Sequence, residues 1–475
     1  MRRAPAIVEA LLVIALLAAG AAVRLRINRD WSFAGADSWG YFKLADELRV
    51  HHRYALGPPP APLHFSRLPG YPLFLTVAQG DHNLDPGWKR LARVQTAIDL
   101  LVTGLVTWWL GRRLGGRVAG LLALAWVALC PFTAEWPVAA LTETLATATT
   151  TVTLALLVPS AREERRARLR FFLAGAVAGL GVLIRQDGLA VGAGFVAALL
   201  VAQVAWAERA KLAGLALVGL VLAYGAWPAR NLYRFGKPYL TGTFVDRYSN
   251  PFFFYTGYHD WMATWSADGA TIPRYGFCFY DGQRCPQSTK DYPPEAFSDA
   301  AERAAVEKLF DLRRREGISG RVHEGFTRVA AQRRAKAPRT VWLTLPLRRA
   351  WRVWVNAHDD ILRDPRWRPW LSLYAKLAPG FEWLAKVLTV GMLLGAALLA
   401  LGRRTRGLAL VLFVALAART VVLAWTFYVE PRYTVEVMPA AYALWGGGLG
   451  VALAGMGGLV ARRRRAPRAA GRPAP

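Results

Sequence analysis

Long apolar runs alternate with shorter charged segments along most of the chain. The first run extends from about Pro5 to Val23, close to the ~20 residues that a helix needs to cross ~30 Å of hydrocarbon. Similar runs occupy residues 91–110, 117–131, 140–158, 171–184, 189–206, 212–229, 380–401, 408–428 and 437–460. The pattern predicts about ten transmembrane helices, and therefore an all-α, polytopic membrane protein.

Lys and Arg are concentrated in alternate connections between these runs. They gather at residues 2–3, 112–117, 162–170, 209–211, 403–406 and 462–465. Cytoplasmic connections carry an excess of basic residues, so we expect these segments and both termini to be cytoplasmic, with an even number of crossings. The net charge of +28 then reflects membrane topology, and no nucleic-acid partner is expected.

A secretory signal peptide would account only for the first apolar run, which has no convincing cleavage site before Arg24. We therefore predict a multi-pass protein of the cell membrane, the inner or plasma membrane of a bacterium. Glu9 and Asp99 lie inside predicted helices, where a charge is costly, and we expect them to pair within the bundle.

The same pattern divides the chain into four parts. Residues 1–229 form a core of helices 1–7 with a first extracytoplasmic loop at 24–90. Residues 230–379 form a small mixed extracytoplasmic domain, 380–461 contain helices 8–10, and 462–475 form a basic cytoplasmic tail.

Each outer region contains a predicted helix. In the first loop, Tyr41, Leu44 and Leu48 recur at helical spacing, which predicts a helix lying along the membrane surface. The outer domain mixes aromatic loops with a charged helix from about Pro294 to Arg315.

Three cysteines occur in the chain. Cys278 and Cys285 lie close together in an outer segment, where an oxidising compartment permits a disulfide; two free thiols are the alternative. Cys130, inside a predicted helix, is interpreted as a small packing residue. The histidines are scattered, so no metal site is predicted.

Several charged residues fall next to the hydrocarbon on the outer face, although such positions cost roughly 2.5–3.5 kcal/mol each on insertion scales. They are Asp37, Glu143, Arg185, Asp187, Arg230, Glu430 and Arg432. Simpler roles exist for some of them. Asp37 could cap the surface helix, Glu143 could favour a helix dipole, and Arg185 could extend to lipid headgroups. Glu430 and Arg432 could form an ion pair without a chemical role.

An outer carboxylate beside several arginines suits a lipid-linked phosphosugar. Asp37 could act as a general base that takes the proton of an attacking hydroxyl. Arg230 and Arg432 could stabilise the charge that develops on the leaving phosphate.

Six short motifs occur in an order typical of one enzyme superfamily. They are Asp37 with Tyr41 and Ala45; PGYPLFL; Thr142-Glu143; GLGVLIRQDGL; Pro228-x-Arg230-Asn231 with Gly236; and Glu430-x-Arg432-Tyr433 with Pro439. Together they resemble the GT-C glycosyltransferases of the protein O-mannosyltransferase and aminoarabinose-transferase superfamily, in its broad bacterial branch. The resemblance extends from about residue 30 to 440 and leaves the outer domain from 240 to 375 unmatched.

The resemblance implies a GT-C architecture, a polyprenyl-phosphate sugar as donor, an extracytoplasmic acceptor and no required cofactor or metal. It implies the role of a catalytic base for Asp37. We expect Glu143 to share the catalytic site, and we expect substrate contacts from Tyr41, Arg67, Tyr71, Arg185, Asp187, Arg230, Asn231, Glu430, Arg432 and Tyr433. Many relatives have two adjacent acids in the first loop, whereas Ser38 follows Asp37 here and Asp46 and Glu47 lie further on.

The predicted function is therefore a membrane glycosyltransferase with membrane lipids, a lipid-linked donor and an outer acceptor as its partners. A transporter or flippase for a lipid-linked envelope intermediate is one alternative, and a non-catalytic envelope-complex protein is another. The sequence does not identify the sugar, the acceptor, the stereochemical outcome or the oligomeric state.

Overall fold

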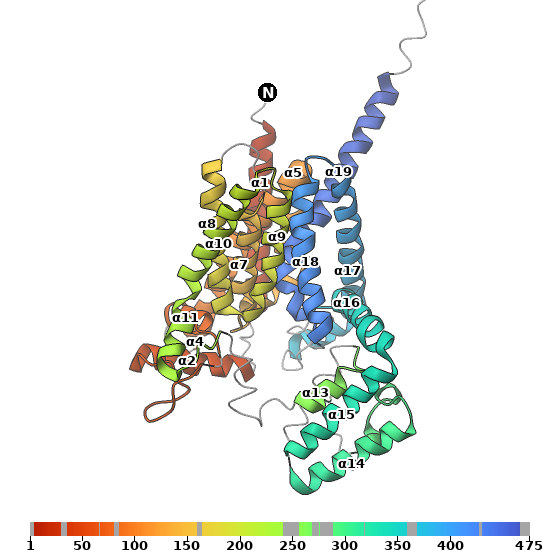
Figure 1. The fold of residues 1–475 in the computed structure, drawn as a ribbon. Coiled ribbons are helices and arrows are strands. Elements are labelled where there is room, and N and C mark those ends of the chain that lie inside the picture. Colours follow the sequence, from red (N-terminus) through yellow and green to blue (C-terminus); the bar gives the residue numbers. More distant parts are fainter. Residues whose placement is uncertain are drawn as a thin grey trace, which may run out of the picture.

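The computed structural model describes residues 4–29, 36–65, 67–79, 85–158, 164–240, 256–267, 275, 288–317, 319–358, 368–426 and 430–465. Figure 1 shows a long helical bundle with a smaller group of helices at one end. The helices α1 and α19, nearest the two chain ends, both extend past the bundle on the side opposite α2 and α13–α15. The predicted all-α, polytopic fold class is confirmed.

The bundle is built from helices drawn from both halves of the chain. They are α1 (Ala4–Arg29), α4 (Asp85–Ala97), η1 (Ile98–Gly104), α5 (Leu105–Leu129), α7 (Glu143–Leu156), α8 (Glu164–Ile184), α9 (Gly192–Val201), α10 (Trp206–Tyr224), α11 (Ala226–Phe235), α17 (Arg368–Leu401), α18 (Arg406–Thr426) and α19 (Met438–Arg465).

Shorter elements connect these helices and form the outer parts. They are α2 (Ala36–His51), α3 (Gly70–Ala78), α6 (Pro131–Ala134), η2 (Trp136–Val138), η3 (Gln186–Val191), α13 (Thr256–Met262), η6 (Thr289–Asp291), η7 (Pro294–Ala296), α14 (Ala300–Glu316), α15 (Gly320–Lys336), η8 (Thr340–Thr344), α16 (Leu345–Val355) and η9 (Pro431–Val437). The helix predicted in the first loop is confirmed as α2, and the charged outer helix is α14.

The longest helical stretch, Trp88–Leu129, is a hairpin and not a single rod. The chain reverses at Gly115 and Gly116, where Gly116 has φ of 83°, a left-handed conformation that glycine adopts at little cost. Beyond this turn Gly120 packs against Trp108, and a Cβ atom at Gly120 would lie 2.9 Å from the Trp108 carbonyl oxygen. The apolar runs predicted at 91–110 and 117–131 are therefore two helices that run side by side.

Six helical stretches in the described residues are long and apolar enough to cross a membrane, and the bent pair of α10 and α11 could make a seventh. The hairpin contains two of the predicted runs, because this one of the six stretches turns back on itself. The remaining two predicted runs form the shorter helices α7 and α9. Every predicted run is thus helical, while the total of about ten crossings stays a prediction.

Charged residues inside the bundle are paired, as expected for Asp99 and Glu9. The guanidinium of Arg24 lies 2.6 Å from Asp99 and donates further hydrogen bonds to the carbonyl oxygens of Val127 and Ala128, both at 2.8 Å. Glu9 pairs with Arg112 and Arg117, each at 3.1 Å. These ion pairs hold α1 against the hairpin.

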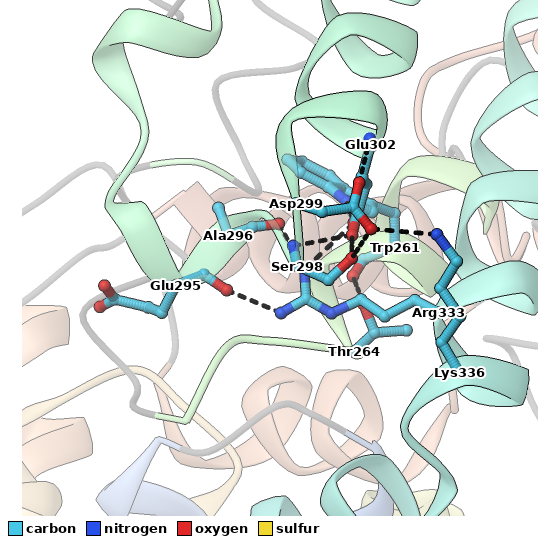
Figure 2. Close-up of polar contacts among 9 residues, drawn as sticks. All are labelled: Trp261, Thr264, Glu295, Ala296, Ser298, Asp299, Glu302, Arg333 and Lys336. Atoms are coloured by element: carbon cyan, nitrogen blue, oxygen red, sulfur yellow. Dashed lines mark hydrogen bonds and ion pairs between the residues drawn. The ribbon is translucent and has the colours of Figure 1, made fainter.

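The smaller group of helices comprises α13, α14 and α15, and we name it the outer group after its predicted side of the membrane. It has its own aromatic core, in which Tyr258, Trp261, Phe310 and Phe326 are fully buried. A polar network at the start of α14 fixes the group, as Figure 2 shows. Asp299 caps the helix by accepting from the Glu302 amide at 2.7 Å. The Glu302 carboxylate accepts from the Trp261 indole and from Arg333, both at 3.1 Å.

The segment η8–α16 joins the outer group to the bundle. Arg349 is buried in α16 and donates to the Ser266 carbonyl oxygen at 2.7 and 2.9 Å and to the Ala424 carbonyl oxygen at 3.2 Å. The Trp354 indole donates to the Thr420 hydroxyl at 2.8 Å. These contacts attach the outer helices to the end of α18, at the same end of the bundle as α2 (Figure 1).

Candidate functional site

Asp37 lies in the first turn of α2, at the end of the bundle opposite the two chain ends. Its Oδ1 atom lies 3.0 Å from the guanidinium of Arg67, and its side chain is 54% exposed. No other contact ties this carboxylate to a described residue. Asp37 is thus oriented by Arg67 and accessible from outside the protein.

The aromatic side chain beside this pair is Tyr41, one helical turn along α2. Arg67 stacks over the Tyr41 ring at 4.8 Å, and Tyr41 makes an edge contact with Tyr71 at 5.1 Å between ring centroids. Burial raises the pKa of the Tyr41 hydroxyl, while the charges of Arg67 and Arg185 oppose that rise. Tyr71 is fully buried and its hydroxyl donates to Gln95 at 3.0 Å. It therefore supports the Tyr41 ring from within the protein.

Glu143 begins α7 and is almost completely buried. Its Oε1 atom accepts from Arg185 at 3.2 Å, and the same guanidinium nitrogen donates to the Thr142 hydroxyl at 2.9 Å. Its second oxygen, Oε2, is shielded from solvent and has no hydrogen-bond partner among the described residues. A buried carboxylate oxygen without a partner is costly, which is typical of a position that a ligand completes.

Two charged residues that the sequence reasoning did not single out hold Arg185 in place. Glu436, in η9, lies 2.6 Å from the Nε atom of Arg185 and 3.2 Å from the guanidinium of Arg419. Arg419 is buried in α18 and also donates to the Tyr433 carbonyl oxygen at 2.9 Å. A charge inside an apolar helix is the signal that could have identified Arg419.

A further ion pair lies in the turn between α18 and α19. Glu430 is 2.5 Å from Arg432, and Arg432 donates to the Tyr433 hydroxyl at 2.8 Å. Burial raises the pKa of Glu430; Arg432 lowers it, and the nearby charges of Glu143 and Asp37 raise it further. The negative charges of Asp37 and Glu143 are therefore close enough to act on Glu430.

Arg230, on α11, lies beside this group of ion pairs. Its guanidinium donates to the His64 carbonyl oxygen at 2.9 Å and to Asn231 Oδ1 at 2.7 Å. The rings of Tyr54, Trp227 and Phe235 surround it at 5.0–5.7 Å. No carboxylate in the described residues pairs with Arg230.

His64 lies between Arg67 and Arg230 and bonds to both. Its ring Nε2 atom accepts from the Arg67 amide at 3.0 Å, while its carbonyl oxygen accepts from Arg230. Burial lowers the pKa of His64 to about 4, with the charges of Arg67 and Arg230 acting in the same direction. A neutral ring is required for Nε2 to accept this hydrogen bond.

The structure thus brings most of the predicted residues together at one end of the bundle. Asp37, Tyr41, Arg67, Glu143, Arg185, Glu430, Arg432 and Tyr433 form one group, and Arg230 with Asn231 lies beside it. The side chain of Asp187 and both Cys278 and Cys285 lie outside the described residues. Cys130 is buried, as expected of a packing residue. In the described residues no group of three acidic, His or Cys side chains is arranged to hold a metal ion.

The fold and the site define a class of protein: a multi-pass helical membrane protein with a charged, partly buried site at one end of its bundle. Residues 88–227 match the family model of the dolichyl-phosphate-mannose-protein mannosyltransferases. The matched segment is shorter than half of the chain. It contains Glu143 and Arg185, but neither Asp37 nor Arg432. The match confirms the predicted resemblance to GT-C glycosyltransferases for this segment.

Several solved structures are similar to most of this chain, and two are described. The oligosaccharyltransferase AglB from Archaeoglobus fulgidus, in complex with an inhibitory peptide and a dolichol-phosphate, is 14% identical with a TM-score of 0.48; the match covers 98% of this chain and 52% of that one. ArnT from Cupriavidus metallidurans, bound to undecaprenyl phosphate, is 17% identical with a TM-score of 0.42; the match covers 90% and 77%. The chain thus spans about half the length of the archaeal enzyme. No curated protein sequence matches it significantly.

Proposed function

We propose that this protein transfers a sugar from a polyprenyl-phosphate donor to an acceptor hydroxyl on the extracytoplasmic side of the membrane. Asp37 takes the proton of the acceptor hydroxyl while its oxygen attacks the anomeric carbon of the sugar. The bond between that carbon and the phosphate oxygen breaks, and polyprenyl phosphate leaves with the negative charge. The observation that carries this proposal is the accessible Asp37 carboxylate, held by Arg67 beside a buried cluster of acids and arginines.

The exposure of Asp37 suits a general base. A base must come within hydrogen-bond reach of an acceptor that arrives from outside, and the half-exposed carboxylate permits this. Arg67 contacts only Oδ1, so Oδ2 is the atom proposed to receive the proton.

Glu143 is proposed to orient the acceptor or the sugar. Its Oε2 atom has no hydrogen-bond partner in the described residues, so a substrate hydroxyl that donates to it would remove an unfavourable feature of the empty site. Arg185, fixed between Glu143 and Glu436, keeps the carboxylate in one orientation.

The pairing of the arginines favours Arg230 as the residue that binds the donor phosphate. Arg67, Arg185 and Arg432 are each ion-paired with a carboxylate, which offsets much of their charge. Among the described residues Arg230 has only neutral contacts, so its full charge is available to an anion. Arg432 is then the second candidate, available if Glu430 moves away.

The proposal is tested with the purified protein in proteoliposomes, supplied with labelled polyprenyl-phosphate sugars and candidate acceptors. Asp37→Asn should lower the rate of sugar transfer by at least roughly 100-fold, the contribution of a positioned base. Asp46→Asn is the matched control, because Asp46 lies on the same helix in a local pair with Arg49. It should transfer sugar at the wild-type rate.

Two results would contradict the proposal. Full transfer by a well-folded Asp37→Asn protein would remove Asp37 as the base. Translocation of the lipid-linked sugar across the vesicle membrane, with no transfer to any acceptor, would instead favour a transporter.

A further inference from the structure

The segment from Thr340 to Val355, which comprises η8 and α16, has two opposite faces. Val341, Leu345 and Arg349, spaced by four residues, are buried against the bundle and the outer group. Leu343 is 52% exposed, Leu347 61% and Trp351 54%, again at four-residue spacing. Residues four apart lie on the same side of a helix, so these large apolar side chains form one stripe, next to the exposed Trp342.

Cations flank this apolar stripe. Arg339 and Arg348 are exposed, and neither is ion-paired with any described residue. Arg334, at the end of α15, lies over the Trp342 ring at 5.9 Å. A helix with tryptophan and leucine on one face and arginines beside it is typical of the boundary between lipid chains and anionic headgroups.

The position of α16 places this stripe at the end of the apolar part of the bundle. Trp354 bonds to Thr420 and Arg349 bonds to the Ala424 carbonyl oxygen, close to the end of the membrane-spanning stretch Arg406–Trp425. Trp425 at that end is also exposed, and Trp383 on α17 is exposed with Lys386 over its ring. Tryptophans gather at membrane–water boundaries in this way.

We propose that the exposed face of η8–α16 is a lipid-binding surface that lies in the outer boundary of the bilayer and binds anionic phospholipid headgroups. Leu343, Leu347 and Trp351 enter the chain region, and Arg339 and Arg348 contact the phosphates. A bilayer is favoured over a protein partner because α16 packs on α18, which itself exposes Val421 and Val422 within a stretch apolar enough to cross a membrane. The surface fixes the height of the outer helices above the membrane, independently of any catalytic role.

The depth of the stripe is measured with a nitroxide label at Leu347→Cys, in a full-length protein whose Cys130, Cys278 and Cys285 are replaced by serine. The labelled protein is placed in nanodiscs of phosphatidylcholine with phosphatidylglycerol. Accessibility to oxygen should exceed accessibility to a polar nickel complex. Glu324→Cys, exposed on α15, is the matched control and should show the reverse. Leu343→Cys serves as a second position if the first variant folds poorly.

The headgroup contact is measured separately, as the preference of the protein for spin-labelled phosphatidylglycerol over phosphatidylcholine. Arg339→Gln combined with Arg348→Gln should reduce that preference, with no change in the thermal unfolding midpoint. A label at Leu347 that is as accessible to the nickel complex as the control overturns the proposal. A label sealed from both reagents also overturns it, because a protein would then cover the stripe.

Discussion

Two buried arginine–carboxylate pairs in this molecule differ in how completely they are satisfied. Deep in the bundle, Arg24 bonds to Asp99 and to three backbone carbonyl oxygens, at 2.8–3.1 Å. At the end of the bundle, Arg185 is equally well held by Thr142, Glu143 and Glu436. Glu143, however, keeps one buried oxygen without a hydrogen-bond partner among the described residues.

Under the proposed function, the difference separates a structural pair from a functional one. Among the described residues, neither Arg24 nor Asp99 has a fully buried polar atom without a hydrogen-bond partner, so this pair links helices and leaves nothing for a ligand. A buried carboxylate oxygen without a partner, as in Glu143, carries an unfavourable free energy that a ligand can relieve. We therefore expect changes to the first pair to act on stability and changes to the second to act on substrate handling.

The largest effect is expected from breaking the structural pair. Arg24→Met leaves Asp99 buried without a cation and should lower the free energy of unfolding by about 3–5 kcal/mol. Thermal unfolding in a fixed detergent measures this loss. The double variant Arg24→Met with Asp99→Leu should recover much of it, and an equally unstable double variant would show that Arg24 acts through its backbone contacts instead.

The functional pair should respond in the opposite way. Glu143→Gln keeps the shape of the side chain but weakens the ion pair with Arg185, so the unfolding temperature should change little. The sugar-transfer rate should fall by roughly 100-fold, because a small misplacement of bound groups costs about that much. If Glu143→Gln instead unfolds like Arg24→Met and retains its specific activity, the distinction between the two pairs is wrong.

A smaller and more selective effect is expected at Arg230. Arg230→Gln removes the guanidinium that lacks a carboxylate partner, and the KM for the lipid-linked donor should rise by about tenfold with a smaller change in kcat. Arg234→Gln, an exposed arginine on the same helix, is the control and should leave the donor KM unchanged. A change in the acceptor KM alone would contradict the assignment of the donor phosphate to Arg230.

The last effect concerns pH and is confined to acidic conditions. The pKa of His64 is about 4 in the folded protein and near 6.5 when unfolded, so the unfolded state binds more protons between these values. The contribution of His64 to stability is therefore complete above about pH 6.5 and is lost as the pH falls toward 4. Unfolding midpoints from pH 4 to 7 should decline less steeply for His64→Gln than for the wild type, and parallel curves would contradict the prediction.

Much of the architecture follows from residue type and spacing alone. Each predicted apolar run forms a helix because a membrane leaves the backbone few other ways to satisfy its hydrogen bonds. The clustering of Asp37, Glu143, Arg185 and Arg432 could be predicted because loop charge assigns them all to one face.

The partners within that cluster could not be predicted, because they depend on the conformations of helix ends. Glu436 pairs with Arg185 across a long stretch of sequence, and only the η9 turn brings them together. Arg230 was expected to bind phosphate, as was Arg432, but its setting among the aromatic rings of Tyr54, Trp227 and Phe235 could not be predicted. Tyr71, expected to contact substrate, uses its hydroxyl to bond Gln95.

The position of Glu436 has a consequence for biosynthesis. It lies in the last tenth of this sequence, two residues before α19, yet it holds an arginine that lies before η3. During translation Arg185 is therefore made long before the residue that fixes it. An incomplete chain already in the membrane lacks an assembled site, so we expect it to leave lipid-linked sugars untouched until its C-terminal helices have inserted.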